Sequence, residues 1–210
     1  MERESLLNDY IRPLFPLFIL VAAFWVIEGL ETASFGFINL DQYGIHPRSL
    51  FSLPYIFSAP LLHGSFQHVA ANSVPFLILG AFIMWRSQTE FWLVTLLVTV
   101  VAGIGTWLTG GANSVHIGAS GLVFGYFGFL ILLGWFERSP TSIIRAAIIA
   151  FLYSGLIWGV LPGQPGISWQ GHLFGFIGGI LAAFWLGRRH VYGNNNTFDD
   201  DFSDKIRIGR

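Results

Sequence analysis

The chain holds a serine and a distant histidine at positions that could support acyl-transfer chemistry. Residues 116–128 read HIGASGLVFGYFG, in which Ser120 stands between Gly118 and Gly121. A serine in a glycine-bounded turn is a candidate nucleophile when a base lies within hydrogen-bond reach, about 2.6 to 3.2 Å. The candidate base is His172, which lies in the segment WQGHLFGFIGG. The pair predicts attack of a hydroxyl group on a carbonyl carbon.

A second polar group stands in the segment HGSFQHVAANS. His68 and Asn72 are four residues apart, so on a helix they share one face, with His63 nearer the preceding loop. Amide and imidazole N–H groups can donate hydrogen bonds to the oxyanion that develops during acyl transfer. We therefore interpret Asn72 and His68 as candidate oxyanion ligands.

Composition indicates a membrane protein. Of 210 residues, 53% are hydrophobic and 11% charged, whereas an ordinary soluble domain has about 25% charged residues. The net charge of −1 gives no indication of a nucleic-acid partner, and the absence of cysteine excludes disulfides and thiolate metal sites. We expect no metal or other cofactor.

Six apolar runs are long enough to cross a membrane as helices, which need about 20 residues each. We therefore predict an all-α, polytopic six-helix bundle. It comprises an N-terminal segment 1–12, a membrane domain 13–187 and a polar, disordered tail 188–210. The expected helices are 13–30, 66–85, 91–109, 117–136, 141–161 and 170–187. The apolar segment 51–62 contains Pro54 and Pro60, is too short to span, and is expected at the outer interface.

Charge distribution predicts the orientation of this bundle. Nearly all of the eleven Lys and Arg residues fall on the side that carries both termini, and Arg48 falls opposite. The positive-inside rule then places both termini in the cytoplasm. We expect the inner, plasma membrane of a bacterium.

With this topology the candidate residues share one depth near the outer face. Ser120 is expected about one turn inside its helix, level with His172, His68 and Asn72. Close approach of two helices in lipid requires small residues. Gly121 borders Ser120, while Gly175 and Gly179 lie on the helix face of His172. Packing is the direct role of these glycines, and it brings the serine near the histidine.

Each residue also has a purely structural interpretation. An isolated serine in a membrane helix commonly bonds to its own backbone. A lone His172, or the pair His68 and Asn72, could simply join helices by hydrogen bonds. We assign no role to His46, His116 and His190. The case for catalysis therefore rests on the whole set occurring at one depth.

In combination, GASG, HxxGxxxG and HxxxxHxxxN resemble the motifs of the rhomboid intramembrane serine proteases over about residues 10–187. The resemblance implies that Ser120 is the nucleophile and His172 the general base, with Asn72 and His68 at the oxyanion. Gly118, Gly121, Phe124, Gly175 and Gly179 would support the site. Three positions depart from the family: Pro54-Tyr55 replaces a Trp-Arg pair, Phe124 replaces a tyrosine, and AFIMWR lacks a glutamate.

The implied activity is endopeptidase cleavage of transmembrane protein substrates near the outer face of the lipid bilayer. A Ser-His dyad is favoured because neither Glu28 nor Glu31 belongs to a motif that links it to His172. The main alternative is a noncatalytic member of the same fold that binds membrane helices. A transporter or channel is disfavoured because ionisable groups such as Glu28 and Arg145 stand near helix ends. The sequence does not indicate an oligomeric state.

Overall fold

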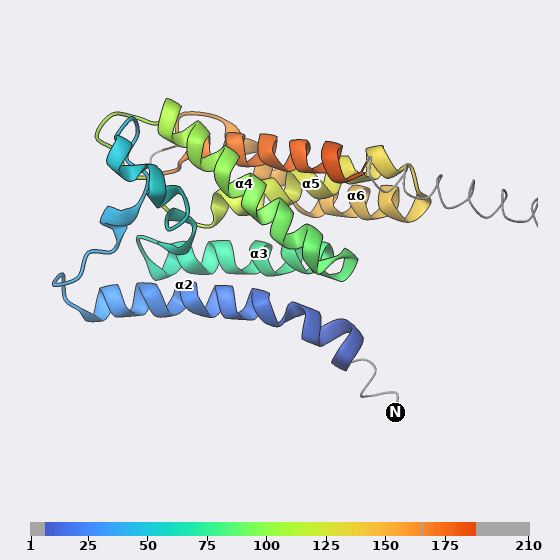
Figure 1. The fold of residues 1–210 in the computed structure, drawn as a ribbon, viewed down its shortest axis with the longest axis horizontal. Coiled ribbons are helices and arrows are strands. Elements are labelled where there is room, and N and C mark those ends of the chain that lie inside the picture. The colour runs from blue at the N-terminus through green and yellow to red at the C-terminus, as the bar shows by residue number, and fades with distance from the viewer. Residues whose placement is uncertain (1–6, 165, 188–210) are drawn as a thin grey trace, which may run out of the picture.

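The computed structural model describes residues 7–164 and 166–187, and this part of the chain is helical without a strand (Figure 1). The predicted all-α fold class is confirmed. Residues 1–6 and the predicted tail 188–210 lie outside the described residues. The long helices are α2 (Phe15–Ala33), α3 (Phe66–Arg86), α4 (Gln88–Thr109), α5 (Ser120–Glu137), α6 (Pro140–Leu152) and a final helix over Trp169–Gly187. Shorter turns are η1 (Leu7–Ile11), η2 (Arg12–Leu14), η3 (Asp41–Tyr43), η4 (Leu50–Ile56), η5 (Ala59–Leu61) and η6 (Ser154–Val160).

Five of the described helices are long and apolar enough to cross a membrane, and α6 with η6 can supply a sixth crossing. The prediction of one continuous helix over 141–161 was wrong, because α6 and η6 meet at an angle of 65°. The α-helix ends where the Tyr153 N–H bonds to the Ile149 carbonyl at 2.9 Å. Ser154 and Gly155 follow, and both residue types favour the helix less than the Ala and Leu residues before them.

Helix α5 begins at Ser120, later than the predicted residue 117. Gly118 has a φ of 113°, a conformation that L side chains rarely adopt. Its N–H bonds to the Ala59 carbonyl at 2.9 Å instead of joining a helix. Ser120 is therefore the first residue of α5 rather than one turn inside it, and its hydroxyl lies at the end of the bundle that we call the site end.

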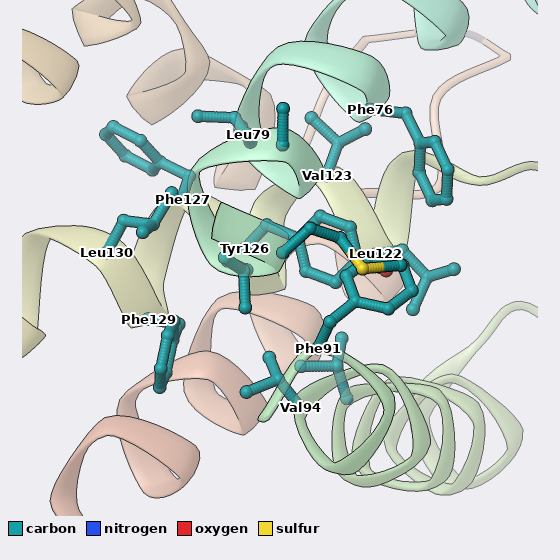
Figure 2. Close-up of a cluster of buried hydrophobic side chains, with 14 of the residues drawn as sticks. Phe76, Leu79, Phe91, Val94, Leu122, Val123, Tyr126, Phe127, Phe129 and Leu130 are labelled. Atoms are coloured by element: carbon teal, nitrogen blue, oxygen red, sulfur yellow. The ribbon is translucent and has the colours of Figure 1, made fainter. Parts of the chain in front are cut away.

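Helix α5 runs through the middle of the bundle and contacts α3, α4 and α6 (Figure 1). Figure 2 shows how side chains from three helices meet along it, with Phe76 from α3 and Phe91 from α4 close to Tyr126 from α5. The Tyr126 hydroxyl, in this apolar cluster, is hydrogen-bonded to the Thr95 hydroxyl at 2.7 Å. This cluster fixes α5 and with it the position of Ser120.

The final helix packs against α5 backbone to backbone. A Cβ atom added to Gly175 would collide with the Gly121 carbonyl oxygen, and one added to Gly179 would collide with the Gly125 carbonyl oxygen. Only glycine allows two helices to approach so closely. The contact brings the first turns of both helices together at the site end.

The chain between α2 and α3 covers part of the site end with η3, η4 and η5. Ile45 pairs with His116 through two backbone hydrogen bonds of 3.0 Å. The Arg48 guanidinium donates to the Gly110 carbonyl at 2.8 Å, and the Trp107 indole donates to the Ser49 carbonyl at 2.8 Å. These bonds fix the loop 110–119, which leads into Ser120, against the α2–α3 connection.

Ion pairs join the helix ends at the opposite end of the bundle. Arg86 of α3 pairs with Glu90 of α4 and with Glu137 of α5. Ser142 of α6 donates a hydrogen bond to the same Glu137. Four helices are thus tied together far from the site end.

Candidate active site

Ser120 is held at the start of α5 by the two residues that precede it. The Gly118 N–H is bonded to Ala59, as described above, and the buried Ala119 N–H donates to His63 Nε2 at 3.4 Å. Neither N–H joins a helix, so the chain turns sharply into α5. The Ser120 hydroxyl has no hydrogen-bond partner among the described residues and lines a cavity of about 720 Å³.

His172 stands in the first turn of the final helix and is 8% exposed. Its Nδ1 lies 2.9 Å from the Gly159 carbonyl oxygen. A carbonyl can only accept, so Nδ1 carries the proton and Nε2 is left as an acceptor. The Phe124 ring stacks on the imidazole with centroids 4.0 Å apart. The ring of His172 is thus fixed in tautomer and plane, as a general base requires.

Ser120 and His172 line the same cavity. Within the described residues no hydrogen bond joins the two side chains, and catalytic contacts are often loose before a substrate binds. The glycine contact of Gly121 with Gly175 lies directly beside them. The structure thereby brings the candidate nucleophile and base to one wall of one cavity.

His68 and Asn72 line this cavity as well, from the first turns of α3. A Cβ atom added to Gly118 would lie 2.8 Å from His68 Nε2 and 3.6 Å from Asn72 Nδ2. Asn72 is 5% exposed, and its Nδ2 has no hydrogen-bond partner among the described residues. A buried amide N–H without a protein partner is costly unless water or a ligand accepts its hydrogen bond. Its donors are therefore available to an oxygen atom placed beside Gly118.

Every candidate named from the sequence lies at this site or in its supporting contacts. Gly118 makes room for His68. Gly175 and Gly179 allow the two helices to touch, and Gly121 supplies the carbonyl oxygen that Gly175 approaches. The Phe124 ring stacks on one face of the His172 imidazole. We found no group of three His, Cys, Asp or Glu residues that could hold a metal ion in the described ranges.

Four further residues shape the site, although no sequence motif assigned them a role: Gly159, His63, His116 and Ser168. Gly159 acts through its backbone carbonyl and through its missing side chain, since a Cβ there would lie 2.6 Å from Phe124 Cζ.

The His63 side chain accepts the Ala119 N–H, and its ring packs edge-on against His68 with centroids 4.9 Å apart. Burial and the neighbouring His68 lower the pKa of His63 to about 4. His116 and Ser168 are hydrogen-bonded to each other at the cavity wall.

Residues 51–189 match the sequence profile of the Rhomboid domain, which covers more than half of the chain. The chain belongs to the rhomboid family. Together with its apolar helices, this membership makes it an integral membrane protein. The match includes all four candidate catalytic and oxyanion residues and the whole of the cavity wall described above.

Several relatives of this rhomboid protein come from bacteria and plants. An uncharacterized protein of Mycobacterium tuberculosis is 37% identical over 174 residues, which cover 79% of this chain and 72% of that protein. YdcA of Bacillus subtilis, whose name assigns it provisionally to the rhomboid proteases, is 33% identical over 59% of this chain and 62% of its own length. RHOMBOID-like protein 4 of Arabidopsis thaliana is 29% identical over 66% of this chain and 35% of its own length.

Proposed function

We propose that this rhomboid protein is an intramembrane serine endopeptidase that uses a Ser120–His172 dyad. The observation that carries the proposal is one cavity that holds a free hydroxyl, an imidazole oriented through Nδ1, and a buried amide donor without a partner. A structural role for these residues predicts satisfied hydrogen bonds, whereas a catalytic role predicts groups kept free for a substrate.

The reaction follows from the roles of these groups. Ser120 Oγ attacks the substrate carbonyl carbon while His172 Nε2 takes the hydroxyl proton. The carbonyl oxygen becomes an oxyanion, which accepts hydrogen bonds from Asn72 Nδ2, from His68 and from N–H groups at the start of α5. The C–N bond then breaks, and the imidazolium gives its proton to the leaving amine. Finally His172 deprotonates a water molecule that attacks the acyl carbon, and the imidazolium returns this proton to Ser120 Oγ as the ester C–O bond breaks and the acid leaves.

The substrates that suit this site are transmembrane segments of other proteins. Ser120 lies at one end of the bundle, so a cut would fall near one membrane face. A helical peptide bond is shielded and already hydrogen-bonded, so the segment must unwind before attack. Glycine and other poor helix formers make unwinding less costly. We expect cleavage beside small residues in such segments.

Orientation and location extend the same proposal. Of the eleven Lys and Arg residues, all but Arg48 lie on or near the side of the two termini, which supports cytoplasmic termini and an outward-facing Ser120. Bacterial relatives support the plasma membrane of a bacterium. Residues 13–187 would then form the membrane domain, between a cytoplasmic N-terminal segment 1–12 and a cytoplasmic tail 188–210.

The test is cleavage in proteoliposomes. Purified protein is reconstituted with a tagged transmembrane segment that carries a glycine-rich stretch near one face, and products are followed by gel and mass spectrometry. We expect one product from the wild type and none from Ser120→Ala or His172→Ala at equal folding. A wild type that binds such segments without cutting any of them would instead support the noncatalytic helix-binding function.

A further inference from the structure

A hydrogen bond between His116 and Ser168 joins the two loops that lead into the helices of the candidate catalytic residues. His116 Nδ1 lies 2.6 Å from Ser168 Oγ. His116 precedes Ser120 by four residues, and Ser168 precedes His172 by four residues. Both side chains line the cavity that holds the dyad. The bond therefore lies in the wall of the same cavity as the proposed dyad.

The direction of this hydrogen bond follows from its neighbours. Ser114 Oγ donates to the Gly111 carbonyl at 2.7 Å, so this hydroxyl proton is already used. His116 Nε2, 2.8 Å from Ser114 Oγ, must then be the donor. A neutral imidazole with its proton on Nε2 accepts at Nδ1. Ser168 therefore donates its hydroxyl proton to His116. Burial lowers the pKa of His116, which keeps the ring neutral.

Ser168 also fixes the beginning of the final helix. Its Oγ receives the Gly171 N–H at 3.4 Å, and its carbonyl receives the His172 N–H at 3.2 Å. Ser168 is thus the N-cap of the helix whose first turn carries His172. A displacement of Ser168 would move His172 with it.

The backbone around His116, at the other end of the hydrogen bond to Ser168, is also fixed. The His116 backbone pairs with Ile45 through two hydrogen bonds of 3.0 Å. Gly118, two residues later, is bonded to Ala59 at 2.9 Å. The loop 110–119 is therefore held by the α2–α3 connection, and the side chain of His116 links this loop to the start of the final helix.

We infer that His116 is a positioning residue, which sets the separation of Ser120 from His172 through its hydrogen bond to Ser168. The inference rests on the proposed function. It assigns His116 no contact with the substrate and no proton transfer. A misplacement of reacting groups by about 1 Å can cost about 100-fold in rate, so a bond that fixes two loops affects catalysis without touching the reacting atoms.

Two variants of His116, each with an amide in place of one of the two ring nitrogens, separate this positioning role from general stability. Asn places its amide oxygen near the position of Nδ1 and keeps the acceptor for Ser168. Gln places its amide near Nε2 and keeps the bond to Ser114 only. The rate of labelling of Ser120 by a fluorophosphonate and kcat/KM for a tagged transmembrane segment are measured, with melting temperatures alongside.

We expect His116→Asn to stay within about tenfold of wild type, and His116→Gln and His116→Phe to fall by about 10- to 100-fold. The fall should lie in kcat and labelling rate, with KM little changed. Labelling at the wild-type rate in His116→Gln would overturn the inference. So would an equal loss in His116→Asn and His116→Gln at equal melting temperatures.

Variants of Ser168, the partner of His116 before the final helix, test the same hydrogen bond from its other side. Glycine is nearly as good an N-cap as serine, whereas alanine is poor. Ser168→Gly and Ser168→Ala should therefore lose labelling rate equally, although Ser168→Ala alone loses stability. Adding His116→Phe to Ser168→Gly should slow labelling no further, because one bond is lost in both; an additive loss contradicts the inference. Failure of the proposed function would appear separately, as a wild type that neither cuts nor labels.

Discussion

The rings of Phe124 and His172 lie parallel, with centroids 4.0 Å apart and an interplanar angle of 8°. On the ring edge, His172 Nδ1 is bonded to the Gly159 carbonyl. In the proposed dyad, the Phe124 ring and the Gly159 carbonyl thus take the orienting role that an acidic residue has in a triad. They hold the imidazole in one plane and one tautomer and leave Nε2 free as an acceptor, which the proposed dyad requires.

Removal of the Phe124 ring should slow the reaction. Parallel aromatic contacts contribute about 0.5 to 1.5 kcal/mol beyond burial, so we expect Phe124→Ala to lower kcat by about 2- to 13-fold. Phe127 is a matched control, because it is equally buried on α5 but contacts Phe176 instead of His172. Both alanine variants should lose about 3 to 5 kcal/mol of stability. Equal kcat values in the two variants would contradict the role of the stack.

A side chain at Gly159 should disturb both partners of His172. An added Cβ would lie 2.6 Å from Phe124 Cζ and 3.2 Å from His172 Nδ1. We expect Gly159→Ala to lower kcat/KM by about 10- to 100-fold in the cleavage assay. Gly155→Ala lies in the same η6 turn and meets no atom within 4 Å, so it should cleave at the wild-type rate. A slow Gly155→Ala would mean that η6 tolerates no substitution and that the contacts of Gly159 are not the cause.

Loss of the free amide of Asn72 should affect the rate and spare the fold. Removal of one oxyanion donor costs about 100- to 1,000-fold in kcat in a soluble serine protease, and we expect a fall of this order for Asn72→Ala. Asn72→Leu keeps the approximate shape of the side chain, removes its donor and should be as slow. Ser73→Ala serves as control: its hydroxyl bonds to Trp25 and Val69, so stability should fall while kcat holds.

Much of this arrangement could be predicted from the sequence, because apolar runs and the spacing of glycines are visible there directly. Apolar runs predicted the helices, and glycine spacing indicated which faces can meet. The break at Tyr153 could not be predicted, because residues 141–161 are mostly apolar on both sides of it and only weak propensities mark the bend. Gly159 was also missed, since its carbonyl is common to all residues. His116 gave no motif, because its partner Ser168 is 52 residues away.

The glycine contact between α5 and the final helix should tolerate no added methyl group. In Gly175→Ala the new Cβ would collide with the Gly121 carbonyl oxygen, so the helices must separate. We expect a loss of about 1 to 3 kcal/mol from overpacking and a loss of cleavage, both measured on protein in one detergent. Gly29→Ala on α2 meets no atom within 4 Å. It should be neutral or stabilising by up to about 1 kcal/mol, and a comparable loss there would contradict the packing argument.

Acid should destabilise the protein through His63. Its pKa is lowered from 6.5 to about 4, chiefly by burial, so the folded protein binds this proton less tightly than the unfolded chain. The contribution to stability is complete above pH 6.5 and is lost as the pH falls towards 4. In His63→Gln an amide oxygen can still accept the Ala119 N–H, but the side chain does not titrate. Melting temperatures across this range should fall less in His63→Gln, and parallel curves would exclude His63 as the cause.

The most direct measurement of the central claim is to map the covalent product of a serine-directed fluorophosphonate on the reconstituted protein. The account predicts a single adduct on the peptide that contains Ser120, formed in the wild type and slowed at least about 100-fold in His172→Ala. An adduct on another serine, or equal labelling of wild type and His172→Ala at Ser120, would contradict the dyad.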